Sequence, residues 1–187
     1  MAAPTLLSFP RHLVPRDIAL QIASYLRIQW PFLENKSGKI WDESPSKVAG
    51  QCFVLMDGDA LISHAQANQR EIEFAGQKLV CGGLSAVFTY PAWRGSGLAK
   101  DVVRAATQHI RESGSDVAML FCGPRLRNFY TECGWEAVDT AQILYGDPVS
   151  PTLKNDNLIM MMFVSETGTQ LKPRISSEPV YVGEQTW

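Results

Sequence analysis

The sequence predicts an α+β fold in which a mixed, mostly antiparallel central sheet is flanked by helices. Three observations lead to this prediction: long β-rich segments joined by turns, a helical segment directly after them, and a short apolar strand after that helix. An antiparallel meander followed by a strand–helix–strand crossover produces such a mixed sheet. With 187 residues, the chain is expected to form a single domain over residues 1–187.

The N-terminal part is expected to contain one helix and one loop. Apolar side chains recur at helical spacing behind Pro15, which predicts a helix over residues 15–29 that ends before Pro31. Residues 1–14 are interpreted as an irregular arm or a short first strand. Residues 31–50 are polar and interrupted by glycine and proline, which predicts a loop.

A meander of long strands follows this loop. Residues 52–56 and 60–74 are β-rich, and the Asp-Gly-Asp sequence at 57–59 is a strong turn signal between them. A second turn leads into residues 78–90, which we expect to form a third long strand. The three segments therefore predict antiparallel neighbours.

Beyond residue 90 the spacing of apolar residues changes from that of strands to that of helices. A helix is expected over 97–113, a buried parallel strand over 117–122 and a second helix over 124–133. Strands are expected at 135–138 and 158–164. Residues 165–187 are interpreted as a polar tail.

Composition excludes several classes of function. Charged residues make up 19% of the chain and the net charge is -2, so no basic field attracts nucleic acid or an anionic membrane. No apolar run approaches the ~20 residues that cross a bilayer, and the N-terminus lacks signal-peptide features. The cysteines and the histidines lack metal-site spacing, so we expect no metal site and interpret the cysteines as buried thiols in a reducing cytoplasm. The cysteines are Cys52, Cys81, Cys122 and Cys133.

The most informative segment is the glycine-rich turn between the third long strand and the next helix. Free N–H groups at a helix N-terminus bind phosphate, and glycine lets the backbone approach it closely. A Walker A loop is absent because no Gly-Lys-Ser/Thr follows, and a third glycine of the dinucleotide-binding pattern is absent as well. The residues expected to bind phosphate are Arg94, Gly95, Ser96, Gly97, Leu98, Ala99 and Lys100.

The sequence resembles the GNAT superfamily of N-acetyltransferases. Arg94, Gly97 and Ala99 match the family pattern Gln/Arg-x-x-Gly-x-Gly/Ala, and Tyr130 stands four residues before Gly134-Trp135, as in many members. The resemblance implies a fold with splayed fourth and fifth strands, acetyl-CoA as cosubstrate and CoA as product.

The same resemblance implies roles for further residues. Backbone groups near Ala86, Val87 and Thr89 would hold the pantetheine arm and the acetyl carbonyl. Tyr130 would protonate the leaving thiolate of CoA.

A narrower resemblance points to the aminoglycoside 2′-N-acetyltransferases. It rests on residues 60–65, 81–83 and 92–95, on Arg125-x-Arg127-x-x-Tyr130, and on the terminal tryptophan. It implies acetylation of the 2′-amino group of a cationic aminoglycoside, of the deoxystreptamine type or kasugamycin-like, with resistance as the result. The tail 165–187 would contribute to the acceptor site, for which the candidate residues are Glu34, Asp42, Asp156, Glu184 and Trp187.

The sequence departs from this narrower group at the expected base. Ser85 stands where the group has a glutamate, and a serine hydroxyl is not a comparable base. We keep Ser85 as a candidate catalytic residue, and we interpret His64 as a structural histidine rather than a base. The tail is also one residue longer between its acid and its end.

Two alternatives stay open. The chain could acetylate another small amine or a protein N-terminus, or it could be a catalytically degenerate acyl-CoA sensor, which Ser85 suggests. Exposed strand edges make a homodimer a further expectation.

Overall fold

The computed structural model describes residues 3–30, 49–154, 157–184 and 186. These residues form two compact units: the first takes residues 1–66 and 86–106, and the second takes 67–85 and 107–187. Three elements run through both units, namely β3 (Ala60–Phe74), β4 (Gln77–Thr89) and α2 (Ala99–Glu112).

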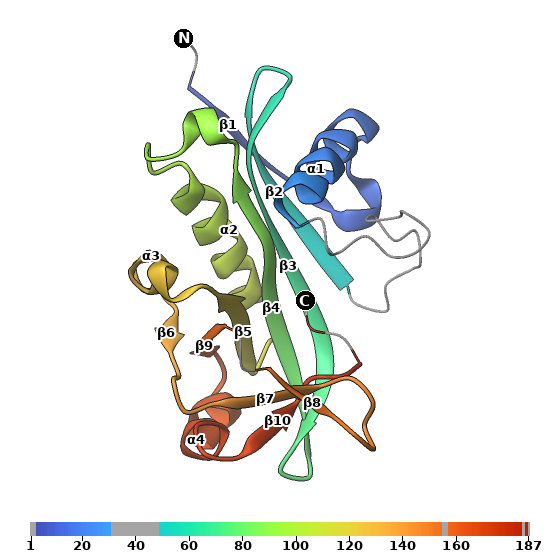
Figure 1. Cartoon of the computed structure of the whole chain (residues 1–187), viewed down its shortest axis with the longest axis vertical. Helices are drawn as coiled ribbons and strands as arrows, with labels where there is room; N and C mark the ends of the chain where they lie inside the picture. The colour runs from blue at the N-terminus through green and yellow to red at the C-terminus, as the bar shows by residue number, and fades with distance from the viewer. Residues whose placement is uncertain (1–2, 31–48, 155–156, 185, 187) are drawn as a thin grey trace. The chain divides into compact units, whose positions relative to one another are not determined.

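The first unit pairs two N-terminal strands and covers them with a helix. β1 (Thr5–Pro10) runs antiparallel to β2 (Ala49–Asp57), and a short 3-10 helix, η1 (Arg11–Leu13), leads to α1 (Arg16–Gln29). Figure 1 shows α1 in blue beside the strands of this unit. Its apolar stripe packs against β2, β3 and β4 in one cluster: Ile18, Ile22, Tyr25, Leu26, Val54, Met56, Leu61 and Phe88. The helix thereby covers the strands that carry the glycine-rich turn.

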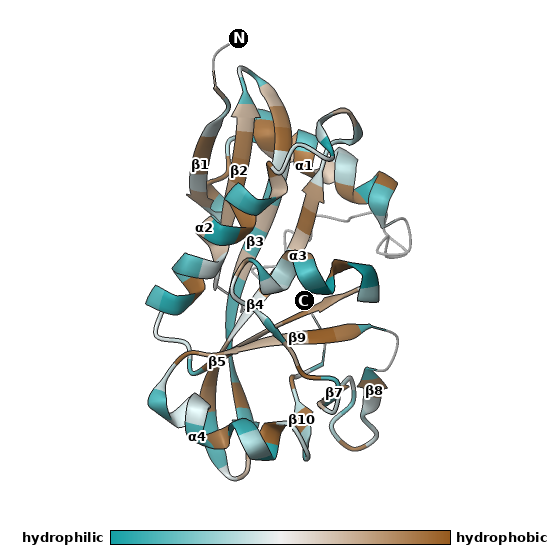
Figure 2. Ribbon diagram, turned by 90° about the vertical axis from the view of Figure 1, so that its left-hand side faces the viewer, coloured by the Kyte–Doolittle hydropathy of each residue, from teal (hydrophilic) through white to brown (hydrophobic). Residues whose placement is uncertain are grey.

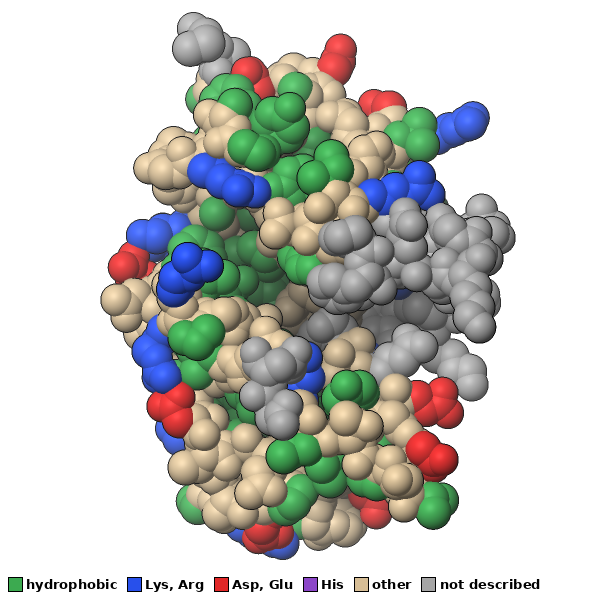
Figure 3. Space-filling view, in the orientation of Figure 1, with side chains coloured by type: hydrophobic (Ala, Val, Ile, Leu, Met, Phe, Trp, Pro, Cys, Tyr) green, Lys and Arg blue, Asp and Glu red, His purple; other side chains and the backbone are tan. Residues whose placement is uncertain are grey.

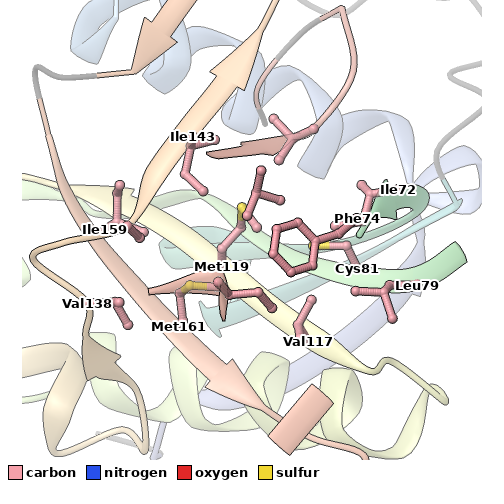
Figure 4. Packing of buried hydrophobic residues seen from close by; sticks show 14 of the residues in the cluster. Ile72, Phe74, Leu79, Cys81, Val117, Met119, Val138, Ile143, Ile159 and Met161 are labelled. Atoms are coloured by element: carbon pink, nitrogen blue, oxygen red, sulfur yellow. The ribbon is translucent and has the colours of Figure 1, made fainter. Parts of the chain in front are cut away.

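The second unit is organised around β5 (Val117–Cys122). It runs antiparallel to β9 (Leu158–Phe163) along its whole length, and β9 also pairs with β6 (Glu136–Ala137). Both β5 and β9 are hydrophobic along most of their length (Figure 2), as expected of strands that are buried on both faces. Figure 4 shows side chains from these and neighbouring strands meeting in one core, among them Cys81, Val117, Met119, Ile159 and Met161.

The sheet is mixed, as predicted. Its strands follow the order β6-β9-β5-β4-β3-β10-β7-β8, with β1 and β2 joined to it through β3. The remaining elements are η3 (Pro91–Trp93), η4 (Pro124–Leu126), α3 (Arg127–Thr131), β7 (Gln142–Tyr145), β8 (Thr152–Lys154), α4 (Glu166–Ile175) and β10 (Pro179–Tyr181). The predicted α+β class is confirmed, and the helices and strands predicted before residue 165 lie close to the observed bounds.

The interpretation of residues 165–187 as a polar tail is wrong. This segment contains α4 and β10, and β10 lies between β3 and β7 in the sheet. Pro173 concealed the helix, because a proline inside a helix removes a backbone donor and normally ends it. β7 and β8 were also not predicted.

Helix α4 is fixed by an N-cap and by a close approach to β5. The Ser165 hydroxyl accepts from Gly168 N–H at 3.0 Å and donates to the Asp116 carboxylate at 2.7 Å. A Cβ on Gly168 would lie 2.0 Å from the Asp116 carbonyl oxygen, which is backbone and cannot turn aside. Glycine is therefore required at this contact.

We predict that Gly168→Ala lowers the free energy of unfolding by about 2–3 kcal/mol, because α4 must move away from the start of β5. Urea denaturation measures this loss. Gly123→Ala is the matched control, since a Cβ there meets no atom within 4 Å and its φ is -67. Equal stability of the two variants would contradict the close packing of α4.

Candidate active site

The glycine-rich turn starts at η3 and ends where α2 begins. Arg94 N–H closes η3 onto the Pro91 carbonyl at 3.2 Å, and Lys100 N–H donates to the Gly97 carbonyl at 2.9 Å. Gly95 and Gly97 between them both have φ of +83, a conformation that favours glycine. The two glycines are therefore what allows the chain to turn from β4 into α2.

This turn leaves a row of backbone donors unused. Among the described residues, none of the amides of Gly95, Ser96, Gly97, Leu98 and Ala99 has a hydrogen-bond acceptor. A Cβ on either glycine would meet no atom within 4 Å, so the space beside the turn is open. The amides also stand at the N-terminal end of a 14-residue helix, where the dipole favours an anion. The geometry fits a phosphate group.

The Arg94 side chain is exposed, and it donates two hydrogen bonds to other parts of the protein. Its Nε donates to the Thr89 carbonyl at 2.9 Å, and its Nη2 donates to the Tyr25 hydroxyl. The Tyr25 hydroxyl in turn donates to the same Thr89 carbonyl at 3.0 Å. These bonds tie the turn to the end of β4 and to α1. Arg94 as a ligand of phosphate stays a prediction, as does Lys100, which lies half-buried in the first turn of α2.

The pairing between β4 and β5 ends within the second unit. Their parallel register runs from Cys81 and Val117 to Gly83 and Met119, although β5 continues to Cys122. Along the described chain, β4 beyond Gly83 has no partner on β5, which is the splay that the sequence resemblance implied. Backbone groups of both strands are freed there, and such groups are suited to hold an amide-containing arm.

Ser85 lies two residues beyond Gly83, the last residue of β4 that pairs with β5. It is half-buried, and its hydroxyl accepts from Asn68 Nδ2 at 2.8 Å. This bond engages one of the two lone pairs of the hydroxyl and leaves its proton for donation. The motif analysis missed Asn68, although the register counted from the turn at Ala75-Gly76 would have placed it near Ser85.

The other predicted residues of β4 lie in the first unit. Thr89 is buried, and its hydroxyl is 2.8 Å from the Ser63 hydroxyl. Val87 is half-buried. Ala86 has a φ of +50 and its carbonyl lies 2.8 Å from Nδ1 of His64.

Tyr130 lies in the second unit on α3. Its side chain is buried and meets the Phe129 ring edge-on, with centroids 4.9 Å apart. Burial raises the pKa of Tyr130, with smaller contributions from the Cys122 and Cys133 thiols, so the hydroxyl keeps its proton at neutral pH. Among the described residues, no hydrogen bond of this hydroxyl is found. It is therefore a protonated and uncommitted donor.

Of the residues predicted to bind the acceptor, the structure describes only one. Glu34, Asp42, Asp156 and Trp187 lie outside the described residues. Glu184 is described and exposed. The chain just before it is firmly tied, because Val182 N–H donates to the Leu144 carbonyl at 2.9 Å and Arg70 Nη1 donates to the Val182 carbonyl at 2.7 Å.

The described residues show a second surface feature, a pocket that the predicted site residues do not line. This pocket of about 590 Å³ in the second unit is lined by residues such as Trp135 and Lys172. Basic side chains on the face shown in Figure 3 are interspersed with acidic and uncharged ones. Within the described ranges, no cluster of His, Cys, Asp or Glu could hold a metal ion, and no helix has the length and apolarity to span a membrane.

Residues 20–138 match the model of the acetyltransferase (GNAT) domain. Over 83 residues the chain is 36% identical to the aminoglycoside 2′-N-acetyltransferase of Mycolicibacterium fortuitum, which covers 44% of this chain. The match spans only 42% of that relative's length.

Solved structures share the fold at low identity. A GNAT family N-acetyltransferase (YhbS) from Escherichia coli in complex with CoA is 16% identical, with a TM-score of 0.59, over 97% of this chain and 91% of that one. An aminoglycoside 6′-N-acetyltransferase complexed with coenzyme A is 12% identical, with a TM-score of 0.59, over 86% of this chain and 97% of that one.

The chain belongs to the GNAT acetyltransferase family, because the family model covers well over half of it and the fold agrees. The reaction of this family is acyl transfer, and its cosubstrate is acetyl-CoA.

We predict that Tyr130→Phe lowers kcat by about 100-fold, because the leaving thiolate would lack the proton that we expect Tyr130 to donate. Stability should stay nearly unchanged, because the hydroxyl has no partner among the described residues. Steady-state kinetics and thermal unfolding measure the two effects.

Tyr181→Phe is the opposite case. The Tyr181 hydroxyl donates to the Gly146 carbonyl at 2.6 Å, so its removal should lower stability by about 1 kcal/mol. A Tyr130→Phe variant that loses stability but keeps its kcat would contradict the assigned role.

Proposed function

We propose that this protein transfers the acetyl group of acetyl-CoA to an amino group of an aminoglycoside. The observation that carries the cofactor side is the row of free amides from Gly95 to Ala99, which suits the diphosphate of CoA. The acceptor side rests on the 36% identity with an aminoglycoside 2′-N-acetyltransferase. A kasugamycin-like or deoxystreptamine aminoglycoside acetylated at the 2′-amino group is the specific substrate we propose, with antibiotic resistance as the result.

The chain supplies binding, alignment and one proton to this reaction. Acetyl-CoA supplies an activated thioester. The amides of the turn hold its diphosphate, and backbone groups of Ala86, Val87 and Thr89 hold the arm and the acetyl carbonyl, where N–H donors stabilise the oxyanion. The amine nitrogen bonds to the carbonyl carbon as the carbon–sulfur bond breaks. Tyr130 gives its hydroxyl proton to the departing sulfur, and the resulting phenolate regains a proton from water.

The proton of the attacking amine needs another route. Ser85 cannot accept it as a carboxylate would, since a hydroxyl is a much weaker base. We propose that Ser85 and Asn68, 2.8 Å apart, order a water that carries this proton to solvent. The reaction then depends on the fraction of the amine that is already neutral.

The acceptor site draws on acidic residues, because ammonium groups in a cleft need charged partners. We propose Glu184, together with Glu34, Asp42, Asp156 and Trp187, for this role. Support for Glu184 comes from the two hydrogen bonds of Val182, two residues before it. They fix the backbone from which Glu184 extends.

Another small amine or a protein N-terminus is the second candidate acceptor. Ser85 favours it, because the residue departs from the aminoglycoside group at the position of its glutamate. An acyl-CoA sensor is the third candidate, and it would bind CoA without turnover.

The test is incubation of the protein with acetyl-CoA and a panel of aminoglycosides that includes kasugamycin, followed by mass spectrometry. We expect one aminoglycoside to gain one acetyl group, with release of free CoA thiol. Acetylation of polyamines or peptides alone would support the second candidate, and CoA binding with no acetylated product would support the sensor.

Two glycine variants control for the cofactor site. Gly97→Glu places bulk and negative charge beside the amide row and should remove both CoA binding and acetylation. Gly58→Glu is matched, because Gly58 also has positive φ and open space around it but lies in the β2–β3 turn. It should affect stability alone.

We also propose a cytoplasmic homodimer. The cysteines are free and buried, as thiols in a reducing compartment are. Edge strand β1 exposes Leu6 and Leu7, which are 44% and 38% accessible, and a second copy would cover them.

A further inference from the structure

Ala86 is a strained residue inside a strand. Its φ of +50 lies in the left-handed region, which residues other than glycine rarely adopt. Such a conformation persists only where the surroundings hold it. Ala75, the other non-glycine residue with positive φ in the described chain, lies in the turn between β3 and β4, where that conformation closes the hairpin. Ala86 lies inside β4, away from any turn, and we call this single left-handed residue the bulge.

His64 on β3 contacts the strained residue directly. Its Nδ1 lies 2.8 Å from the Ala86 carbonyl oxygen, and its ring is fully buried and stacked on Phe88, with centroids 5.2 Å apart. A carbonyl oxygen only accepts, so Nδ1 must carry the proton. Nε2 has no partner among the described residues, so the ring's polar contact is made through Nδ1.

Burial keeps this ring neutral. Desolvation lowers the pKa of His64 to about 4, and the hydrogen bond to Ala86 opposes this only in part. The ring is therefore a fixed donor at neutral pH. It cannot act as a general base at the same time, because its free nitrogen is buried.

The bulge decides where the next part of β4 points. An irregular residue inside a strand turns the backbone groups that follow it. Beyond the bulge, two hydrogen bonds link this end of β4 to β3. The Ser63 hydroxyl donates to the Phe88 carbonyl at 2.8 Å, and the N–H of Tyr90, the residue after β4, donates to the Ile62 carbonyl at 2.8 Å. The short stretch between these bonds and Ala86 is the backbone assigned to the acetyl carbonyl.

We propose that His64 is a positioning residue: its Nδ1–H bond to the Ala86 carbonyl fixes the left-handed bulge, and so aims the β4 backbone at the acetyl thioester. The step from the bulge to the thioester rests on the proposed function. The bond between His64 and Ala86 does not.

The first experiment reads the tautomer and needs no activity. Two-bond ¹H–¹⁵N correlation spectra of the ¹⁵N-labelled protein report three histidines, His12, His64 and His109, and the His64→Asn variant identifies the signal of His64. The expected result at pH 7 is a neutral ring protonated at Nδ1. A ring protonated at Nε2, or at both nitrogens, would overturn the proposal.

The second experiment separates positioning from packing. His64→Leu keeps the bulk and removes the donor, and we expect kcat to fall by about 10- to 100-fold, with a smaller change in KM for acetyl-CoA. His64→Asn places an amide N–H near the position of Nδ1 and should restore part of kcat. Adding Ala86→Gly to His64→Leu should also restore kcat, because glycine adopts positive φ without the penalty.

Two outcomes contradict the positioning role. One is a kcat of His64→Leu equal to that of the unaltered protein. The other is the same fall in kcat whether or not Ala86→Gly is present, which indicates general loss of packing. If the unaltered protein acetylates no amine, the proposed function fails. The hydrogen bond between His64 and Ala86 is then tested by the tautomer of His64 alone.

Discussion

The turn from β4 into α2 leaves five consecutive backbone amides, Gly95 to Ala99, without a hydrogen-bond acceptor among the described residues. The two glycines of the turn hold these amides in an open conformation, and the dipole of α2 adds positive potential at the same place. An anionic group satisfies both requirements at once. We propose that this backbone arrangement, rather than charged side chains, binds the diphosphate of the cosubstrate. Membership of the acetyltransferase family rests on the match of residues 20–138 to the family model.

Strand β4 contributes to both ends of the reaction that we propose. It leaves β5 after Gly83, takes a bulge at Ala86, and ends at Thr89, whose carbonyl accepts from both Arg94 and Tyr25. The turn is thus tied to a hydrogen-bond network that includes Tyr25 on α1. Arg94 illustrates the point, since its guanidinium positions the turn while the neighbouring amides remain open.

The sequence was most informative where local rules decide the structure. Alternation and turn residues predicted the hairpin strands, and Gly97 with its neighbours marked the helix start. Sequence could not reveal the partners of Arg94 or His64, because they join residues far apart in the chain. It also failed over α4, where Pro173 stands in the last turns of a helix that Ser165 caps. There tertiary contact with Asp116 outweighed the local preference.

The central claim is that the amides of Gly95 to Ala99 hold the diphosphate of CoA. Amide chemical shifts and hydrogen exchange of these residues, followed by NMR as CoA is added, test it most directly, with pantetheine as the ligand that lacks the diphosphate. The account predicts that these amides shift and become protected with CoA and stay unchanged with pantetheine. Binding of CoA that leaves all five amides unshifted and unprotected would contradict it.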